Sequence, residues 1–354
     1  MTNKVVSVVG ARPQFVKAAV VSDQLRAVGL PEVMIHTGQH YDANMSDVFF
    51  AALGIPEPAY NLGIGGGSHG EMTGRQLAEI ERCLLDERPD AVLVYGDTNS
   101  TLAGALAAVK LHIPVAHVEA GLRSFNERMP EEINRIVADR ISAVLFTPSK
   151  VASANLRAEG IAESRIVEVG DVMYDAALRY GPTAPPSAGR LDRCVVTIHR
   201  AENTDDAARL GTIVEALIEL ARSMRVTFPV HPRTRKALTD AGWWRRLAAR
   251  VELIEPLGYI EMLAAIRAAD VVITDSGGLQ KEAYFLATPC VTLRGETEWT
   301  ETVALGWNRL VTELSIEGIV AAVTGTRRPV VSDAKPYGDG RASAKIAQFL
   351  RATI

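Results

Sequence analysis

Short apolar runs alternate with longer amphipathic stretches along almost the whole chain. The runs are rich in valine and isoleucine and stay apolar at consecutive positions, which predicts strands buried on both faces of a parallel sheet. In the first half these strands are expected at Val5–Val9, Val33–His36, Ala91–Val94, Val115–Val118, Val144–Thr147 and Ile166–Val169. Helical periodicity lies between them at Arg75–Asp86, Leu102–Leu111, Glu131–Ile141 and Val151–Glu159. The alternation predicts repeated βαβ units with right-handed crossovers.

The alternation is interrupted once and then resumes. Within Tyr180–Arg193 the run GPTAPPSAGR gathers glycine, proline and serine, which predicts a surface linker. Further strands are expected at Cys194–Ile198, Val226–Val230, Val251–Ile254, Val271–Thr274, Cys290–Leu293 and Leu310–Val311. A final amphipathic stretch, Arg341–Leu350, predicts a helix that returns to the first domain. We therefore expect an α/β protein of two Rossmann-like domains facing across a cleft, residues 1–170 with 339–354 and residues 171–338.

Composition agrees with a soluble protein of two domains. The chain has 354 residues, 47% hydrophobic and 23% charged, and about 150 residues make a typical domain. Its net charge of −4 excludes a general attraction to nucleic acid or anionic membranes. No apolar run approaches the ~20 residues that span a bilayer, and the opening run is too short for a signal peptide. The three cysteines lack metal-binding spacing, so we expect no structural zinc, no disulfide framework and a cytoplasmic protein.

The clearest candidate site lies at the end of a buried strand, at Asp275. There Ser276, Gly277 and Gly278 open a helix. Ser276 is expected to cap this helix, and the two glycines let backbone amides approach a ligand closely. A helix N-terminus attracts anions, and Glu282, one turn further on, could accept hydrogen bonds from a ribose diol. The pattern favours a nucleotide site, although a tight turn with a surface glutamate would use the same residues.

A second group of charged residues follows the first strand. Arg12 is expected in the turn and Lys17 roughly one helical turn further along, after a proline that suits a helix start. Two cations at a strand end suit an anionic substrate, although they also fit an ordinary exposed turn. The turn lacks the GxGxxG pattern, and no acidic residue follows at the spacing of a dinucleotide site. We therefore expect no NAD-type cofactor.

Acidic residues follow the next strands of the first half. Asp97 comes after VLVYG, Glu119 closes the run VAHVE, and Glu131 lies with Glu132 in the first turn of a helix. Each has an ordinary explanation as a helix cap, a strand end or a partner of the helix dipole. Carboxylates that converge at one edge of a sheet would instead raise one another's pKa and supply an acid and a base at neutral pH. Arg135, four residues after Glu131, is expected to pair with it.

The second half carries histidines and arginines at its strand ends. His199 and Arg200 follow one predicted strand, and His231 follows the next. A single histidine is often structural, but a strand-end position beside arginines suits the binding of a diphosphate. Gln39 and His40, after the second strand of the chain, form a similar but weaker signal.

In their order and combination these segments resemble the non-hydrolysing UDP-N-acetylglucosamine 2-epimerases over essentially the whole chain. The segments that carry the resemblance are GARPQFVK, HTGQHYDANMSDVFF, VYGDTNSTLAGALAA, HVEAGLRS, MPEEINR, TIHRAEN, FPVHPRT, TDSGGLQKEA and RGETEWTE. The resemblance implies a fold like that of GT-B glycosyltransferases, a homodimer, a UDP-sugar substrate, and neither a redox cofactor nor a metal.

The resemblance also implies roles for individual residues. UDP would be held mainly by the second domain, with the uracil packed against main chain near Leu257–Tyr259. The implied substrate-binding residues are Arg12, Lys17, His199, Arg200, His231, Tyr259, Ser276, Gly277, Gly278 and Glu282. The acid/base candidates are Asp97, Glu119 and Glu131, and the candidate regulatory residues are Gln39 and His40.

The chemistry implied by the resemblance is an elimination followed by a re-addition. The C2 proton of the sugar has no adjacent carbonyl, so simple proton abstraction is very unfavourable. UDP would leave across C1–C2 to give a 2-acetamidoglucal, and would then add back while C2 is protonated on its other face. Cations on the diphosphate would stabilise the departing charge, and carboxylates would move the protons.

Several positions depart from the commonest pattern of the family. Ala11 stands where many members have threonine, Gln14 replaces a glutamate, and TEWTE replaces TERPE. With DANMSDVFF and SHGEMTG, these features resemble the branch that acts on UDP-2,3-diacetamido-2,3-dideoxyglucuronic acid. A carboxylated sugar needs one more cation, for which Arg75, Arg123 and Arg128 are candidates. The exact sugar and any allosteric activation by UDP-N-acetylglucosamine are left open.

Other classes of protein would share parts of this pattern. A GT-B glycosyltransferase would use the same fold and nucleotide site but transfer the sugar to an acceptor, and it would not need three acids in the first domain. A hydrolysing epimerase would release UDP, and a non-catalytic binding protein would keep only the second-domain site. The intact set of Asp97, Glu119 and Glu131 favours the epimerase.

Overall fold

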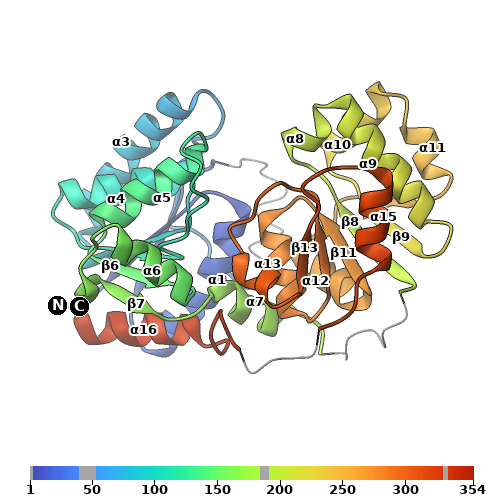
Figure 1. Ribbon diagram of the computed structural model, residues 1–354. Coiled ribbons are helices and arrows are strands. Elements are labelled where there is room, and N and C mark those ends of the chain that lie inside the picture. The colour runs from blue at the N-terminus through green and yellow to red at the C-terminus, as the bar shows by residue number, and fades with distance from the viewer. Residues whose placement is uncertain (1–2, 40–52, 184–190, 330–333) are drawn as a thin grey trace. The chain divides into compact units, whose positions relative to one another are not determined.

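The computed structural model describes residues 3–39, 53–183, 191–329 and 334–354. It consists of two compact units (Figure 1). Unit 1 is Met1–Ala176 with Lys335–Ile354, and unit 2 is Ala177–Ala334. The change from one unit to the other lies inside helix α7 (Val172–Tyr180), whereas the sequence predicted a boundary after residue 170.

The sheet of unit 1 is entirely parallel, with strand order β3-β2-β1-β4-β5-β6-β7. Its strands are β1 Val5–Val9, β2 Glu32–His36, β3 Tyr60–Asn61, β4 Ala91–Tyr95, β5 Val115–Val118, β6 Val144–Thr147 and β7 Ile166–Glu168. All six strands expected from the apolar runs are present. Only β3 was missed, because two residues are too few to show any hydrophobic pattern.

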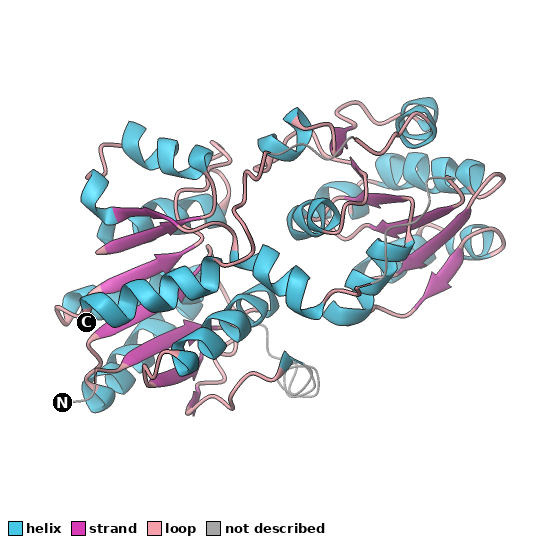
Figure 2. Cartoon of the chain, turned by 90° about the horizontal axis from the view of Figure 1, so that it is seen from below, coloured by secondary structure: helices cyan, strands magenta, loops and turns pink. Residues whose placement is uncertain are grey.

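Helices cover both faces of this sheet (Figure 2). One face carries α3 His69–Glu87, α4 Asn99–Lys110, α5 Pro130–Ile141 and α6 Lys150–Ala158; the other carries α1 Arg12–Ala27 and α16 Ala342–Thr353. A short 3-10 turn, Glu163–Arg165, precedes β7. Helix α16 lies against α1, and its Phe349 ring meets Phe146 of β6 edge-on at 5.5 Å between centroids. The predicted return of the C-terminal helix to the first domain is confirmed.

Unit 2 repeats the plan with a six-stranded parallel sheet of order β10-β9-β8-β11-β12-β13. Its strands are β8 Arg193–Thr197, β9 Arg225–Pro229, β10 Glu252–Ile254, β11 Val271–Thr274, β12 Cys290–Thr292 and β13 Asn308–Leu310. Its helices are α8 Ala201–Thr204, α9 Ala207–Leu220, α10 Pro232–Asp240, α11 Trp244–Ala248, α12 Tyr259–Ala268, α13 Gly277–Phe285, α14 Thr300–Ala304 and α15 Ile316–Thr324. The larger core lies under α9, α10, α11 and α15, and a smaller one lies under α12 and α13.

In each sheet the winding direction reverses beside the first strand, between β1 and β4 in unit 1 and between β8 and β11 in unit 2. Ligands of open α/β sheets bind beyond the carboxyl ends of strands at such a reversal. The predicted α/β fold of two parallel sheets is therefore confirmed, and it identifies the strand ends where a site is expected in each unit. Among the described residues, no helix is long and apolar enough to cross a membrane.

Candidate active site

At the reversal point of unit 1, Lys17 of α1 forms an ion pair with Glu119, the residue that follows β5. Both side chains are buried, with 9% and 8% of their surfaces exposed. The sequence predicted Lys17 as a contact for substrate anions and Glu119 as an acid or base. The structure brings the two together, so the ammonium group compensates a carboxylate that is largely removed from water.

Gly96, the residue after β4, lies beside this ion pair. A Cβ on Gly96 would lie 3.1 Å from Lys17 Nζ and 3.3 Å from Glu119 Oε2, and the φ of Gly96 is +61°. Glycine is required here both for the close approach and for the left-handed backbone. Glu119 itself has a φ of 70°, which is uncommon for a residue with a Cβ and indicates a locally strained backbone.

Asp97 follows Gly96 and accepts hydrogen bonds from Arg135 of α5, with Nε 3.0 Å and Nη2 2.9 Å from Oδ2. The alternative prediction, that Asp97 caps the helix, is wrong, because Thr98 is the N-cap of α4 and its side chain accepts a hydrogen bond from the Thr101 amide. One third of the Asp97 side chain remains exposed. Asp97 is therefore oriented by a buried arginine while it stays accessible to a ligand.

The two acids in the first turn of α5 have different environments. Glu132 is buried and accepts hydrogen bonds from the amides of Ser124 and Phe125, and it forms an ion pair with Arg135. Glu131 is exposed. Arg135, expected to pair with Glu131, instead bridges Asp97 and Glu132. Of these two neighbours, Glu131 is the one available to a ligand, whereas Glu132 holds the preceding loop.

Gln14, noted from the sequence only as a departure from the family pattern, helps to shape the site. Its side-chain oxygen accepts from the amides of Gly10 and Ala11, and its nitrogen donates to the carbonyl of Tyr95 at 2.7 Å and to Thr101. It thereby ties the turn after β1 to the end of β4. The signal was its position three residues after the helix N-cap, which favours glutamate or glutamine.

The other predicted residues of unit 1 lie around the same edge. Arg12 is exposed in the first turn of α1. The Gln39 side-chain oxygen accepts hydrogen bonds from the Ser100 amide at 3.1 Å and from the Ser100 hydroxyl at 2.8 Å, and so joins the end of β2 to α4. His40 lies outside the described residues. The regulatory role predicted for Gln39 and His40 stays a prediction.

At the reversal point of unit 2, a fully buried carboxylate organises the turn that carries the predicted cations. Asp275 accepts hydrogen bonds from the amides of His199 and Arg200 at 3.0–3.1 Å and from Asn203 Nδ2 at 3.1 Å. His199 Nδ1 lies 3.4 Å from Asp275 Oδ1. Asp275 therefore fixes the backbone from which both His199 and Arg200 project.

His199 and His231 lie together, with ring centroids 5.9 Å apart. His231 is the N-cap of α10 and its Nδ1 accepts from the Arg233 amide, so the proton of the neutral ring lies on Nε2. Burial lowers the pKa of His199; the Asp275 charge opposes this, whereas His231, Arg200 and Arg233 lower the pKa further. The unliganded His199 is therefore a neutral ring held among cations.

The N-terminus of α13 has no side-chain cap and is suited to a hydrogen-bond acceptor from a ligand. Ser276 is the N-cap by position, but its hydroxyl makes no capping hydrogen bond, so the predicted side-chain cap is wrong. The turn is instead held by the Ser276 amide, which donates to Thr274 Oγ1, and by Gln280 Nε2, which donates to the Ser276 carbonyl. A Cβ on Gly278 would meet no atom of the described residues within 4 Å. The first amides of the helix thus receive no side-chain cap from Ser276, and a helix N-terminus of this kind suits an anion.

Further polar groups around this helix start were not singled out from the sequence. A Cβ on Gly277 would lie 3.8 Å from Arg200 Nη2, from Glu298 Oε2 and from Trp299 Nε1. Glu298 is paired with Arg294, the residue that follows Leu293 after β12, at 3.1 Å. In the sequence these residues belong to the segment RGETEWTE, which supported the resemblance to the family but was given no role in the site. Since Arg200 reaches the helix start, the predicted residues after β8 and β11 belong to one site.

The remaining predicted residues of unit 2 lie on two helices. Glu282 is buried on α13 with 6% of its surface exposed, beside Lys281, whose ammonium lies 3.8 Å from the centre of the Trp299 ring. Tyr259 begins α12, and its ring meets the Tyr180 ring edge-on at 6.3 Å. Within the described part of the chain, no cluster of histidine, cysteine, aspartate and glutamate side chains could hold a metal ion.

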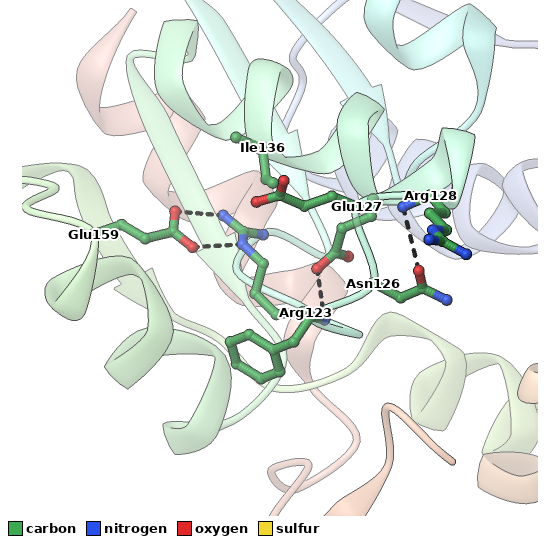
Figure 3. Close-up of a pocket in the computed structure, with 8 residues that line it drawn as sticks. Arg123, Asn126, Glu127, Arg128, Ile136 and Glu159 are labelled. Carbon is green, nitrogen blue, oxygen red and sulfur yellow. Dashed lines mark hydrogen bonds and ion pairs between the residues drawn. The ribbon is translucent and has the colours of Figure 1, made fainter. Parts of the chain in front are cut away.

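Unit 1 also contains a cavity of about 530 Å³ beside the loop that precedes α5 (Figure 3). Among its lining residues are Arg123 and Arg128, two of the cations considered for a carboxylated sugar. Arg123 points to Glu159, with its Nε 2.6 Å from Oε1 (Figure 3). Its Nη1 also donates to Asp139. Its guanidinium is fully engaged inside the protein, whereas Arg128 and Arg75 are exposed.

Comparison with known proteins places these features in a family. A family model described as UDP-N-acetylglucosamine 2-epimerase matches residues 24–351. The UDP-2,3-diacetamido-2,3-dideoxy-D-glucuronate 2-epimerase of Pseudomonas aeruginosa is 51% identical over 98% of this chain and 99% of its own. The UDP-N-acetylglucosamine 2-epimerase of Methanocaldococcus jannaschii is 43% identical over 97% of each chain.

Solved structures agree with the sequence comparison. The crystal structure of Methanocaldococcus jannaschii UDP-GlcNAc 2-epimerase in complex with UDP-GlcNAc and UDP matches with a TM-score of 0.88 and 42% identity, over 99% of this chain and 100% of that chain. The Neisseria meningitidis UDP-GlcNAc 2-epimerase bound to UDP-GlcNAc matches with a TM-score of 0.85 and 28% identity, over 99% of this chain and 100% of that chain. The chain belongs to the UDP-N-acetylglucosamine 2-epimerase family.

Proposed function

We propose that this protein inverts C2 of a UDP-linked 2-acetamido sugar without net hydrolysis. The proposal rests on one observation above all, the buried Lys17–Glu119 pair at the reversal point of unit 1. A carboxylate held in a left-handed backbone beside Gly96, in a family of 2-epimerases, is best explained as a group that handles a proton.

The reaction needs a base, an acid and a stabilised leaving group. One carboxylate removes the C2 proton, the C1–oxygen bond to UDP breaks, and a C1–C2 double bond forms. A second acid then protonates C2 on the opposite face while the diphosphate oxygen returns to C1. We assign these proton transfers to Asp97, Glu119 and Glu131, without dividing the roles among them.

The diphosphate is assigned to the strand ends of unit 2. The uncapped start of α13 offers the amides of Gly277 and Gly278, and Arg200 lies next to Gly277. His199 and His231 border this turn. Backbone amides and cations at the leaving oxygen stabilise charge that develops in the transition state, and they need no reorganisation when the bond breaks. Ser276, Glu282, Tyr259 and Arg12 complete the proposed contacts.

The sugar itself is either UDP-N-acetylglucosamine or its 2,3-diacetamido-uronic acid analogue. The 51% identity to the Pseudomonas aeruginosa enzyme makes the uronic acid the first substrate to test. Its carboxylate would need a cation, and Arg75 and Arg128 are the exposed candidates. We further propose that the protein is a cytoplasmic homodimer that needs no cofactor.

Incubation of the purified protein with each UDP-sugar in D₂O, followed by NMR, tests the proposal. We expect deuterium at C2 of the recovered UDP-sugar and both C2 epimers at equilibrium, for at least one of the two substrates. Net formation of free UDP without an epimer would make the protein a hydrolase. Turnover only after addition of a sugar acceptor would make it a glycosyltransferase.

A further inference from the structure

A buried pair of residues behind the acids, His117 of β5 and Asp139 of α5, has no assigned role. The His117 Nδ1 atom lies 2.7 Å from Asp139 Oδ1, and the two side chains are 0% and 1% exposed. His117 Nε2 lies 2.7 Å from the carbonyl oxygen of Gly96. Because both ring nitrogens face acceptor oxygens, both must carry a proton for the two hydrogen bonds to form.

The other oxygen of Asp139 continues the network toward the loop after Glu119. Asp139 Oδ2 accepts from the Gly121 amide at 3.1 Å and from Arg123 Nη1 at 2.8 Å. Burial alone would raise the pKa of Asp139, but the charges and hydrogen bonds of His117 and Arg123 outweigh burial and lower it. Asp139 is therefore a carboxylate that holds three groups from β5 and the loop that follows it.

These contacts converge on the backbone of the proposed acids. The carbonyl that His117 holds belongs to Gly96, the residue before Asp97 and the one whose α-carbon borders the Lys17–Glu119 pair. His117 itself is two residues before Glu119, and Gly121 is two residues after it. The buried His117–Asp139 network thus fixes both the turn that carries Asp97 and the segment that carries Glu119.

A gain in stability alone is a weak reason for burying this network of charged groups. Burying four charged or ionised groups, namely His117, Asp139, Arg123 and the partly covered Glu159, carries a desolvation cost that apolar residues of similar volume avoid. What apolar residues cannot do is set the direction of the Gly96 carbonyl and hold Glu119 in its left-handed backbone. The contacts therefore point to positioning.

We infer that His117 and Asp139 are positioning residues for the epimerase reaction, acting through the Gly96 carbonyl and the Gly121 amide on Asp97 and Glu119. This inference rests on the proposed function. It predicts that loss of the hydrogen bond to Gly96 lowers kcat and leaves the KM for the UDP-sugar nearly unchanged, because most of the contacts assigned to UDP lie in unit 2 and His117 contacts none of them.

Two isosteric variants separate the two hydrogen bonds of His117. In His117→Gln the amide nitrogen replaces Nε2 and can still donate to Gly96, and in His117→Asn it replaces Nδ1 and can donate only to Asp139. We expect kcat of His117→Asn to fall about 100-fold, as a displacement of about 1 Å at a reacting group can do. His117→Gln should retain at least ten times more activity than His117→Asn.

Leu84→Ala is the control for stability alone, since Leu84 is a buried apolar residue of α3 in the same unit and takes no part in the hydrogen bonds of His117 and Asp139 described above. Equal kcat losses in His117→Asn, His117→Gln and Leu84→Ala at matched melting temperature would overturn the inference. A kcat of His117→Asn equal to that of His117→Gln would also overturn the inference. If either His117 variant fails to fold, Asp139→Asn replaces it, and unchanged kcat in that variant would equally overturn the inference.

A crystal structure of His117→Asn gives a readout that does not depend on turnover. We expect the Gly96 carbonyl to turn away from its present direction and the φ of Glu119 to leave the left-handed region. An unchanged backbone at both residues would overturn the positioning role. If the wild-type protein epimerises neither UDP-sugar, the proposed function fails, and this structural comparison still decides whether His117 holds the acids in place.

Discussion

At corresponding strand ends the two units carry opposite charges. Glu119 follows β5 in unit 1 and is compensated by Lys17, whereas Arg294 follows β12 in unit 2 and is compensated by Glu298. After the neighbouring strands, unit 1 presents Asp97 to solvent. At the corresponding position of unit 2, after β11, the aspartate Asp275 is buried, and the backbone amides at the start of α13 are presented instead.

The sheets around these residues have the same order near the reversal point, so topology does not explain the difference. The parallel strands fix where the ends lie, and the one or two residues after each strand decide what they offer. Unit 1 offers carboxylates that can take and give protons, and unit 2 offers donors suited to a diphosphate. Variants in either unit can test this contrast.

The largest effect is expected from Glu119→Gln in unit 1. Removing the carboxylate proposed to transfer a proton, and with it the negative charge that compensates the buried Lys17, should lower kcat by about 10³-fold. UDP affinity should change little. The measurement is C2 deuterium exchange by NMR together with UDP titration calorimetry. Glu163→Gln, a carboxylate 68% exposed and paired with Arg157, is the matched control and should exchange normally.

If Glu119→Gln exchanges the C2 deuterium at the wild-type rate, Glu119 does not take part in the proton transfers. A result in which it loses UDP affinity in parallel with kcat would show that the acids of unit 1 also hold the nucleotide. Either outcome would weaken the contrast between the two units.

Asp275→Asn in unit 2 should reduce the free energy of unfolding by about 1–3 kcal/mol, because a fully buried acceptor of two backbone amides and Asn203 loses its charge. UDP affinity should fall with it, since the turn bearing His199 and Arg200 loosens. Urea unfolding and UDP titration measure the two effects. Asp240→Asn, an exposed residue paired with Lys236, should change neither; equal behaviour of the two variants would refute a structural role for Asp275.

Gly277→Ala should weaken UDP binding by about tenfold, or about 1.4 kcal/mol. Its stability should be unchanged, because the added methyl group would meet its nearest neighbours only at 3.8 Å. The methyl group would instead occupy the space through which a phosphate approaches the amides. Gly74→Ala in α3, where a Cβ also has room, is the control and should bind UDP normally. Undiminished affinity in Gly277→Ala would exclude the helix start as the phosphate site.

The smallest effect concerns pH. Burial lowers the pKa of His199 below its usual value of about 6.5, so the unfolded chain binds more protons than the folded unit between the two values. The neutral ring therefore contributes full stability above about pH 6.5 and loses it as the pH falls toward the folded pKa. With 40% of the side chain exposed, the effect should be slight.

Thermal unfolding of wild type and His199→Asn between about pH 5 and 8 measures this contribution. The stability of wild type relative to the variant should decrease as the pH falls. The exposed His112 provides the control, since His112→Asn should run parallel to wild type. A relative stability that rises toward low pH would mean that Asp275 dominates over burial at His199.

Much of the fold could be predicted because buried parallel strands have a clear sequence signature. Val5–Val9, Val115–Val118, Val144–Thr147 and Val271–Thr274 have the bounds expected from their apolar runs. The two-residue β3 was out of reach of any periodicity. Strand ends could likewise be located, which is why the candidate site residues were chosen near the correct edges.

Partners could not be predicted in the same way. Lys17 and Glu119 are 102 residues apart, and nothing in either segment indicates the other. Arg135 was expected to pair along its own helix, but Asp97 competes successfully because the end of β4 comes within hydrogen-bond distance of α5. The Ser276 cap was predicted from residue type, and the structure uses Thr274 and Gln280 instead.

The amino-acid sequence by itself determined the alternation of strands and helices, the two parallel sheets and the identity of the residues at the strand ends, because these depend on local patterns of burial and turn chemistry. Tertiary structure alone decided that Lys17 compensates Glu119, that His117 and Asp139 lie behind them, and that the start of α13 is left uncapped. The physical reason is that strand register and crossover packing select which distant side chains come within hydrogen-bond distance, and no local pattern encodes that choice.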